Sequence, residues 1–220
     1  VLLVGPSGTG KSLSGRVIMN QAKATFIWVA ARDFYYGGGF RSMDEAFELA
    51  TGYAPTVLFL EDVDSYLDRQ TVDLLKTRMD GLTQSTGVTT ILTSNFPEHL
   101  PEAIIDRPGR FHDVLKLSLP DASARAAMLG RWMPDLGDAD RTTAVDATAG
   151  YSGAHVRELA RFAAIIAEQD GVSLASALTR ALEKLREQRE LITAVQERWA
   201  HYRPPVHLER SEGRVLSTEN

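Results

Sequence analysis

An eight-residue loop near the start of the chain constrains the fold more than any other feature. Residues 5–12 read G-P-S-G-T-G-K-S, which fits the pattern G-x-x-x-x-G-K-S/T in full. A short apolar strand is expected before the loop, at 1–4, and a helix after it, at 11–22, which is the context that a phosphate-binding P-loop requires. Glycines let backbone N–H groups turn inward around a phosphate at the positive end of the helix. The pattern therefore predicts a nucleotide site.

Two side chains of this loop have predicted chemical roles. Lys11 is expected to reach the β- and γ-phosphates, and the Ser12 hydroxyl to coordinate Mg²⁺. The residues predicted to bind the nucleotide through this loop are Gly5, Pro6, Ser7, Gly8, Thr9, Gly10, Lys11, Ser12 and Leu13.

The first 120 residues alternate between short apolar runs and helical patterns. Further strands are expected at 25–29, 57–60, 88–93 and 114–117, and further helices at 42–50 and 71–81. Strands that alternate with helices build parallel sheets through right-handed crossovers. The predicted fold class is therefore α/β, with a parallel five-stranded sheet and helices on both faces.

The sequence pattern changes after residue 120. Residues 121–202 are rich in alanine, with larger apolar residues at three- and four-residue spacing, which predicts a small all-helical lid domain. The apolar stripe at 173–202 is expected to pack on its own domain, with partner binding as the alternative. Residues 203–220 are predicted to form a flexible tail. Residues 1–120 would form the large domain, whose N-terminal part we expect to be missing because its first strand is so short.

Composition and charge argue against several classes of protein. The chain has no cysteine, which excludes disulfides and thiolate metal sites and favours a reducing, cytoplasmic location. The longest apolar runs are too short to span a bilayer, so we expect no membrane segment. A net charge of −5 without a lysine or arginine block argues against a surface for nucleic acid.

Two adjacent carboxylates follow the expected third strand. Glu61 and Asp62 stand at the end of a buried strand, where α/β sheets bind their ligands. One carboxylate is needed to hold Mg²⁺ and a second to polarise the attacking water. In nucleotide sites of this class, the residue on the metal side is usually Asp and the residue on the water side is usually Glu. Here the order is reversed, with Glu61 on the metal side and Asp62 on the water side. An error near 1 Å can cost ~100-fold in rate, so we expect the reversal to affect hydrolysis more than binding. The predicted Mg²⁺ ligands are Ser12, Glu61 and Asp62.

The P-loop and the two carboxylates, taken together with the motifs that follow them, resemble the AAA family of ring-shaped ATPases over roughly residues 1–170. The sequence T-S-N at 93–95 is similar to the sensor 1 motif, which implies that Asn95 helps to orient the lytic water. The sequence R-P-G-R-F at 107–111 resembles the second region of homology. That resemblance implies that Arg107 and Arg110 reach the γ-phosphate of a neighbouring subunit, whereas surface ion pairs are the alternative.

Two more segments extend the resemblance. The sequence G-Y-S-G-A at 150–154 is similar to the sensor 2 segment, which implies that Gly153 and Ala154 pack against the adenosine. His155 stands where the family usually has an acidic residue, and we interpret it as structural. Tyr35, Tyr36 and Gly37 fall where unfolding members carry a pore loop whose aromatic ring grips extended polypeptide. The alternative is a surface loop whose tyrosines pack locally.

The resemblance implies an ATPase that uses ATP and Mg²⁺. The first interpretation is a subunit of a homo-oligomeric, hexameric ring that remodels or unfolds protein substrates. A slow ATP-dependent switch or scaffold is the second, favoured by the reversed carboxylates. A DNA-handling loader is the third, and the acidic charge argues against it. The predicted catalytic residues are Lys11, Glu61, Asp62, Asn95, Arg107 and Arg110.

Overall fold

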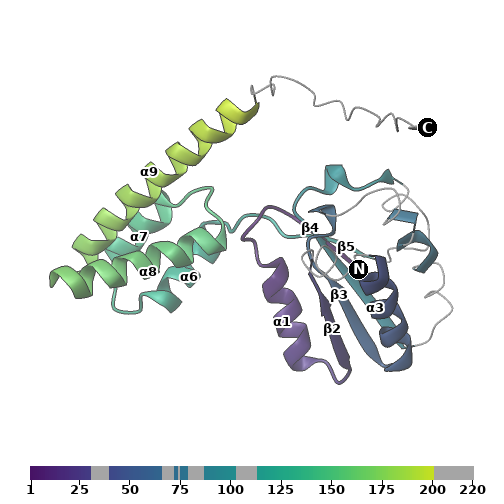
Figure 1. Cartoon of the computed structure of the whole chain (residues 1–220). Helices are drawn as coiled ribbons and strands as arrows, with labels where there is room; N and C mark the ends of the chain where they lie inside the picture. Colours follow the sequence, from purple (N-terminus) through teal and green to yellow (C-terminus); the bar gives the residue numbers. More distant parts are fainter. Residues whose placement is uncertain (31–39, 66–71, 74, 79–86, 103–112, 201–220) are drawn as a thin grey trace, which may run out of the picture.

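A computed structural model of the protein describes residues 1–30, 40–65, 72–73, 75–78, 87–102 and 113–200. In Figure 1 a sheet flanked by helices lies beside a separate group of helices, and the segment after the last strand joins the two. The strands are β1 (Leu2–Val4), β2 (Thr25–Val29), β3 (Thr56–Leu60), β4 (Val88–Ser94) and β5 (Val114–Lys116). The helices beside the sheet are α1 (Lys11–Gln21) and α3 (Phe40–Gly52), with short 3-10 turns η1 (Val63–Ser65) and η2 (Pro97–His99).

The five strands form one sheet in the order β2–β3–β4–β1–β5, and every neighbouring pair is parallel. β4 lies between β3 and β1, with Leu92 opposite Leu60 of β3 and Ser94 opposite Val4 of β1. Because the strands run in one direction, the segments that follow β1, β3 and β4 leave the sheet at the same edge. This edge brings together the P-loop, the two carboxylates and Asn95.

Apolar side chains pack on both faces of the sheet, because successive residues of a strand point to opposite sides. Leu58 and Leu60 belong to a core shared with Phe47 of α3, whereas Phe59 belongs to a second core shared with Ile18 of α1. Figure 1 shows α1 and α3 on opposite sides of the sheet. The predicted α/β class, with a parallel five-stranded sheet and helices on both faces, is therefore confirmed.

The second group contains α6 (Ala122–Trp132), α7 (Asp138–Ala147), α8 (Gly153–Asp170) and α9 (Leu174–Ala200). These helices share a core of their own, centred on the fully buried Leu129 and Leu159. α6 begins where the Asp121 side chain accepts a hydrogen bond of 2.8 Å from the Ala124 N–H. This local cap satisfies a backbone donor at the helix start. An all-helical C-terminal group was predicted, and the domain limits at 120 and 202 stay predictions.

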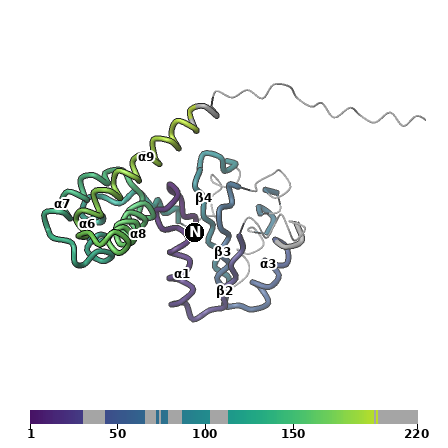
Figure 2. The backbone as a smooth tube through the Cα atoms, turned by 60° about the vertical axis from the view of Figure 1, so that its left-hand side comes forward, coloured from purple at the N-terminus to yellow at the C-terminus, as the bar shows by residue number. Residues whose placement is uncertain are grey.

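The apolar stripe of α9 packs on its own domain for only part of its length. Leu178 and Leu185 are buried, whereas Leu191 and Val195 are 67% and 52% exposed. Figure 2 shows the last turns of α9 extending past α6 and α8, which explains the difference. The packing prediction therefore holds for the first half of the helix and is wrong for the second.

Most other elements have the predicted type, with ends displaced by a few residues. α3 begins at Phe40 rather than at residue 42, and β4 ends at Ser94 rather than at residue 93. The helix predicted at 71–81 is helical at the residues described there, 72–73 and 75–78. Within the described part of the chain, no helix combines the length and the apolar composition of a membrane span.

Candidate functional site

The P-loop connects β1 to α1 and needs glycine at position 8 for two reasons. Gly8 has φ 77°, a left-handed conformation that other residues rarely adopt. A Cβ atom on Gly8 would lie 2.5 Å from Ser152 Oγ and 2.8 Å from the Cβ of Ala154. Gly10, at the N-cap of α1, provides no side-chain cap for the helix start. The first N–H groups of α1 are thereby left to an external acceptor such as a phosphate.

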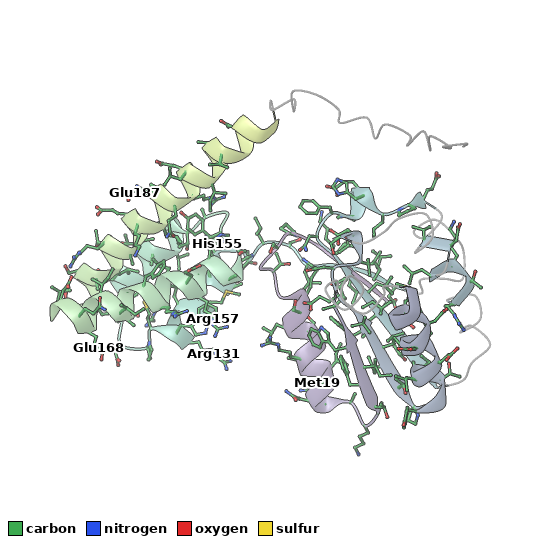
Figure 3. All side chains as sticks on the ribbon, in the orientation of Figure 1. Met19, Arg131, His155, Arg157, Glu168 and Glu187 are labelled. Atoms are coloured by element: carbon green, nitrogen blue, oxygen red, sulfur yellow. The ribbon has the colours of Figure 1, made fainter. Side chains whose placement is uncertain are left out.

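The start of α8 lies directly over the P-loop. The Ala154 N–H donates a hydrogen bond of 3.2 Å to the Gly8 carbonyl. Ser152 caps α8, and its Oγ lies 2.8 Å from His155 Nδ1. Figure 3 places His155 at the end of α8 nearest the sheet. The segment predicted to pack against adenosine therefore contacts the phosphate loop, while its role toward adenosine stays a prediction.

Lys11 is buried, and its ammonium group has three acceptors. Nζ donates to the Gly5 carbonyl at 2.6 Å, to the Pro6 carbonyl at 3.1 Å and to Asn95 Oδ1 at 2.7 Å. Three partners match the three donors of an ammonium group. Burial lowers the pKa of Lys11, and the negative charges of Asp62 and Asp64 oppose that shift. Lys11 thus lies inside the loop, with its charged end directed toward the carboxylates beyond β3.

Glu61 faces the start of α1. The Ser12 hydroxyl donates to Glu61 Oε1, and the indole N–H of Trp28 donates to Oε2 at 3.0 Å. Two predicted Mg²⁺ ligands are therefore in direct contact. Trp28 was not among the predicted site residues, because a tryptophan inside an apolar strand pattern indicates only core packing.

Asp62, the third predicted Mg²⁺ ligand, has different partners. Its Oδ1 accepts a hydrogen bond of 2.9 Å from Asn95 Nδ2, and its backbone N–H donates to Thr93 Oγ1 at 2.9 Å. Asn95 therefore bridges Lys11 and Asp62, with its amide oxygen on the first and its amide nitrogen on the second. Asp62 also has φ 52°, which is uncommon outside glycine and marks a residue held in place by its surroundings.

The surroundings of Asp62 raise its pKa. Burial is the largest cause, and repulsion from Glu61 and Asp64 adds to it. The positive charge of Lys11 and the hydrogen bond from Asn95 act in the opposite direction. A carboxylate with a raised pKa is a stronger base than an ordinary aspartate, as proton acceptance from water requires. Asp64, whose Oδ1 accepts from the Asn95 N–H at 3.3 Å, is a second residue that the sequence analysis did not select.

Replacing Asp64 should move the titration of Asp62. We expect the Asp62 carboxyl in nucleotide-free protein to titrate above the ordinary aspartate range, and at lower pH in Asp64→Asn than in the wild type. The sign follows because Asp64 raises this pKa by repulsion, while the new amide keeps an oxygen for the Asn95 N–H. The pH dependence of the carboxyl ¹³C shift measures it. Asp140→Asn, exposed in α7, is the control and should leave the midpoint unchanged.

Two predicted parts of the site lie outside the described residues. These are the loop residues Tyr35, Tyr36 and Gly37, and the pair Arg107 and Arg110. Their roles stay predictions.

The sheet order, the P-loop at its carboxyl edge and the adjacent carboxylates define a nucleotide-binding module of the P-loop class. A family model described as "ATPase family associated with various cellular activities (AAA)" matches residues 1–119. This match covers more than half of the chain, and the chain therefore belongs to the AAA family of ATPases. The resemblance inferred from the motifs is confirmed.

Several curated proteins are similar to the chain. It is 34% identical over 185 residues to a yeast (Saccharomyces cerevisiae) protein named "Mitochondrial inner membrane i-AAA protease supercomplex subunit YME1", covering 77% of this chain and 25% of the relative. It is 33% identical over 191 residues to the "ATP-dependent zinc metalloprotease FtsH" of Marinobacter nauticus, covering 78% of this chain and 30% of the relative. The chain thus spans about a quarter to a third of these relatives.

Among solved structures, the FIGL-1 AAA domain in complex with ADP is similar in fold. The two superpose with a TM-score of 0.71, covering 90% of this chain and 77% of the other. Their sequences are 24% identical, so this likeness concerns the fold alone.

Proposed function

We propose that the contacts at the carboxyl edge of the sheet form a Mg²⁺-dependent ATP hydrolysis site. One observation carries this proposal: two sets of contacts converge beside the P-loop. In the first, Ser12 is bonded to Glu61, and in the second, Asn95 joins Lys11 to Asp62. The first set combines ligands for a hard cation, and the second connects the phosphate-binding lysine to a basic carboxylate.

The residues present fit Mg²⁺. This ion prefers oxygen ligands and is usually held by one or two protein groups together with phosphates and water. The Ser12 hydroxyl and the Glu61 carboxylate supply two such oxygens at the start of α1. When bound, Mg²⁺ would neutralise charge that develops on the phosphate oxygens. Asp62 is the less suitable ligand, because its described hydrogen bond is to Asn95.

Asp62 then takes the role of the residue that polarises the attacking water. Its raised pKa makes it a better proton acceptor, and its bond to Asn95 fixes the orientation of the carboxylate. Lys11 would leave the Gly5 and Pro6 carbonyls to bind phosphate, because those oxygens compete for the same donors. Asn95 would remain beside both groups and orient the water.

We propose, at a second level, that the chain is a subunit of a hexameric ring that remodels or unfolds protein substrates. Family membership supports this assignment, as do the names of the relatives, one a supercomplex subunit and another an ATP-dependent protease. Arg107 and Arg110 would complete the site of the neighbouring subunit, and Tyr35 and Tyr36 would contact the substrate. A cytoplasmic location stays a prediction.

If the chain works in a ring, its ATPase activity should depend cooperatively on protein concentration. Turnover per subunit should rise steeply across the concentration range in which sedimentation detects assembly, because each site needs arginines from a neighbour. Arginine fingers are worth ~10³–10⁵ in rate, so dissociated subunits should be nearly inactive. Steady-state ATPase assays on a dilution series, paired with ultracentrifugation, measure this.

Mixing two inactive variants distinguishes a catalytic site that is formed by two subunits from a site that lies within one subunit. Arg110→Ala keeps its own phosphate loop, and Lys11→Met keeps its arginines, so mixed rings should regain part of the activity that each lacks alone. Turnover that is independent of assembly, with no recovery on mixing, would contradict the ring and favour the slow switch. Salt-dependent binding of single-stranded DNA would instead favour a loader.

A further inference from the structure

Glu61 has a second fixed contact that the proposed mechanism does not use. While Ser12 engages Oε1, the indole N–H of Trp28 lies 3.0 Å from Oε2. Indole nitrogen is a donor only, so Trp28 can hold a carboxylate but cannot compete with it for a cation. The contact therefore occupies one oxygen of Glu61 and leaves the other facing the start of α1.

Strand register brings Trp28 to this position. Trp28 of β2 lies opposite Phe59 of β3, and the Glu61 N–H continues the ladder by donating to the Val29 carbonyl at 2.8 Å. Residues two apart on a strand share a face, so Glu61 extends from the same side of the sheet as Phe59 and Trp28. This is the side that α1 covers.

Aromatic packing fixes the indole ring. The Trp28 and Phe59 ring centroids are 4.6 Å apart, and Phe26 is 5.9 Å from each of them. Phe59 is fully buried under α1, where a Cβ atom on Gly15 would come within 2.7 Å of its ring. The helix therefore approaches the ring closely, and Trp28 packs against a neighbour that is itself enclosed. The N–H of such an indole has a defined direction.

The reversed order of Glu61 and Asp62 explains why this contact would matter for the metal site. Glutamate has one more rotatable bond than the aspartate usual at the metal side, and fixing a flexible side chain costs entropy. We propose that Trp28 is a positioning residue for Glu61, holding Oε2 so that Oε1 is directed to Ser12 and the cation. This inference rests on the proposed role of Glu61 as a Mg²⁺ ligand.

Trp28→Phe removes the donor and keeps an aromatic ring. We expect the affinity of the protein–ADP complex for Mg²⁺ to fall about tenfold, the loss typical of a hydrogen bond to a charged group. ADP binding without Mg²⁺ should be unchanged, because the described hydrogen bond of Trp28 is to Glu61 and not to the P-loop. Calorimetric titrations of ADP with and without Mg²⁺ measure both quantities. Trp132→Phe, at a partly buried residue packed against the core of the helical group, is the matched control and should alter neither.

A double-mutant cycle separates positioning from general packing. In a Glu61→Gln background, Trp28→Phe should have almost no further effect on Mg²⁺ affinity, because the ligand that Trp28 positions is already lost. A structural defect would persist in that background. If Trp28→Phe binds Mg²⁺ like the wild type, the positioning role is wrong. If the wild type itself takes up ADP without any Mg²⁺ effect, the proposed metal site fails first.

The contact can also be tested without altering Trp28. The chain has three tryptophans, at 28, 132 and 199, so the indole N–H signals can be assigned with Trp132→Phe and Trp199→Phe. Glu61→Gln should shift the Trp28 signal, since its acceptor changes from a carboxylate to an amide, and should leave the Trp132 signal in place. An unmoved Trp28 signal in folded Glu61→Gln protein would overturn the proposal.

Discussion

Lys11→Met is expected to weaken ATP binding by about 100-fold or more. The substitution removes the only side-chain cation described inside the P-loop, where its ammonium group already has three acceptors. Hydrogen bonds to charged groups are worth about 1.5–3 kcal/mol each, and losing two of them to phosphate gives a loss of this size. Methionine keeps the buried stem, so the helix start should stay packed. Calorimetry with Mg-ATP measures the affinity.

Lys23→Ala is the control for this experiment. Lys23 is an exposed lysine in the turn after α1, and its removal should change ATP affinity by less than about twofold. Circular dichroism should show the same helix content in both variants. If folded Lys11→Met protein binds Mg-ATP as tightly as the wild type, the phosphate cradle has been assigned to the wrong loop.

Asp62→Asn is expected to reduce turnover by about 10²–10⁴-fold while ATP affinity changes little. General bases contribute rate enhancements of this order, and an amide cannot accept the proton of the attacking water. Asparagine can still accept the hydrogen bond from Asn95 through its amide oxygen, so the surrounding contacts should persist. Single-turnover hydrolysis with saturating ATP measures the loss. If the variant turns over ATP as fast as the wild type, another residue accepts the proton of the attacking water.

The same substitution should stabilise the protein. An acid whose pKa is raised by folding costs stability as the pH rises above its unfolded-state pKa, and the full cost is reached above the folded-state value, because ionisation is less favourable in the folded protein. Asparagine removes the charge and also tolerates the left-handed backbone at φ 52°. We expect the Tm of nucleotide-free protein at pH 7 to rise by about 2 °C. Asp135→Asn, at an exposed acidic residue between α6 and α7, should leave the Tm unchanged.

The fold could be predicted because its signals are local in the sequence. An apolar run such as 57–60, between helical patterns, is a buried parallel strand in any α/β arrangement, and β3 is fully buried at Thr56–Leu60. The second half of α9 was harder to predict. Ile192 and Val195 continue the helical spacing of the apolar stripe that contains Leu178 and Leu185, and only the end of the neighbouring helices decides that they are exposed.

The site could be predicted in its parts but not in its connections. The spacing of the P-loop identified Lys11 and Ser12, and the acidic pair after a strand identified Glu61 and Asp62. Which carboxylate contacts which loop residue depends on strand order, because β4 lies between β1 and β3 and presents Asn95 between Lys11 and Asp62. No sequence signal connects Trp28 to Glu61 across 33 residues.

The sequence by itself determined the AAA class, the phosphate loop and the two carboxylates, since each depends on residue types at fixed short spacing. Only the tertiary structure decided which of these residues contact one another and which chemical role each of them can have. Parallel pairing of β1, β3 and β4 brings distant side chains to one edge, where burial and neighbouring charges raise the pKa of Asp62 and lower that of Lys11. Such effects depend on distances through space, which local spacing along the chain does not determine.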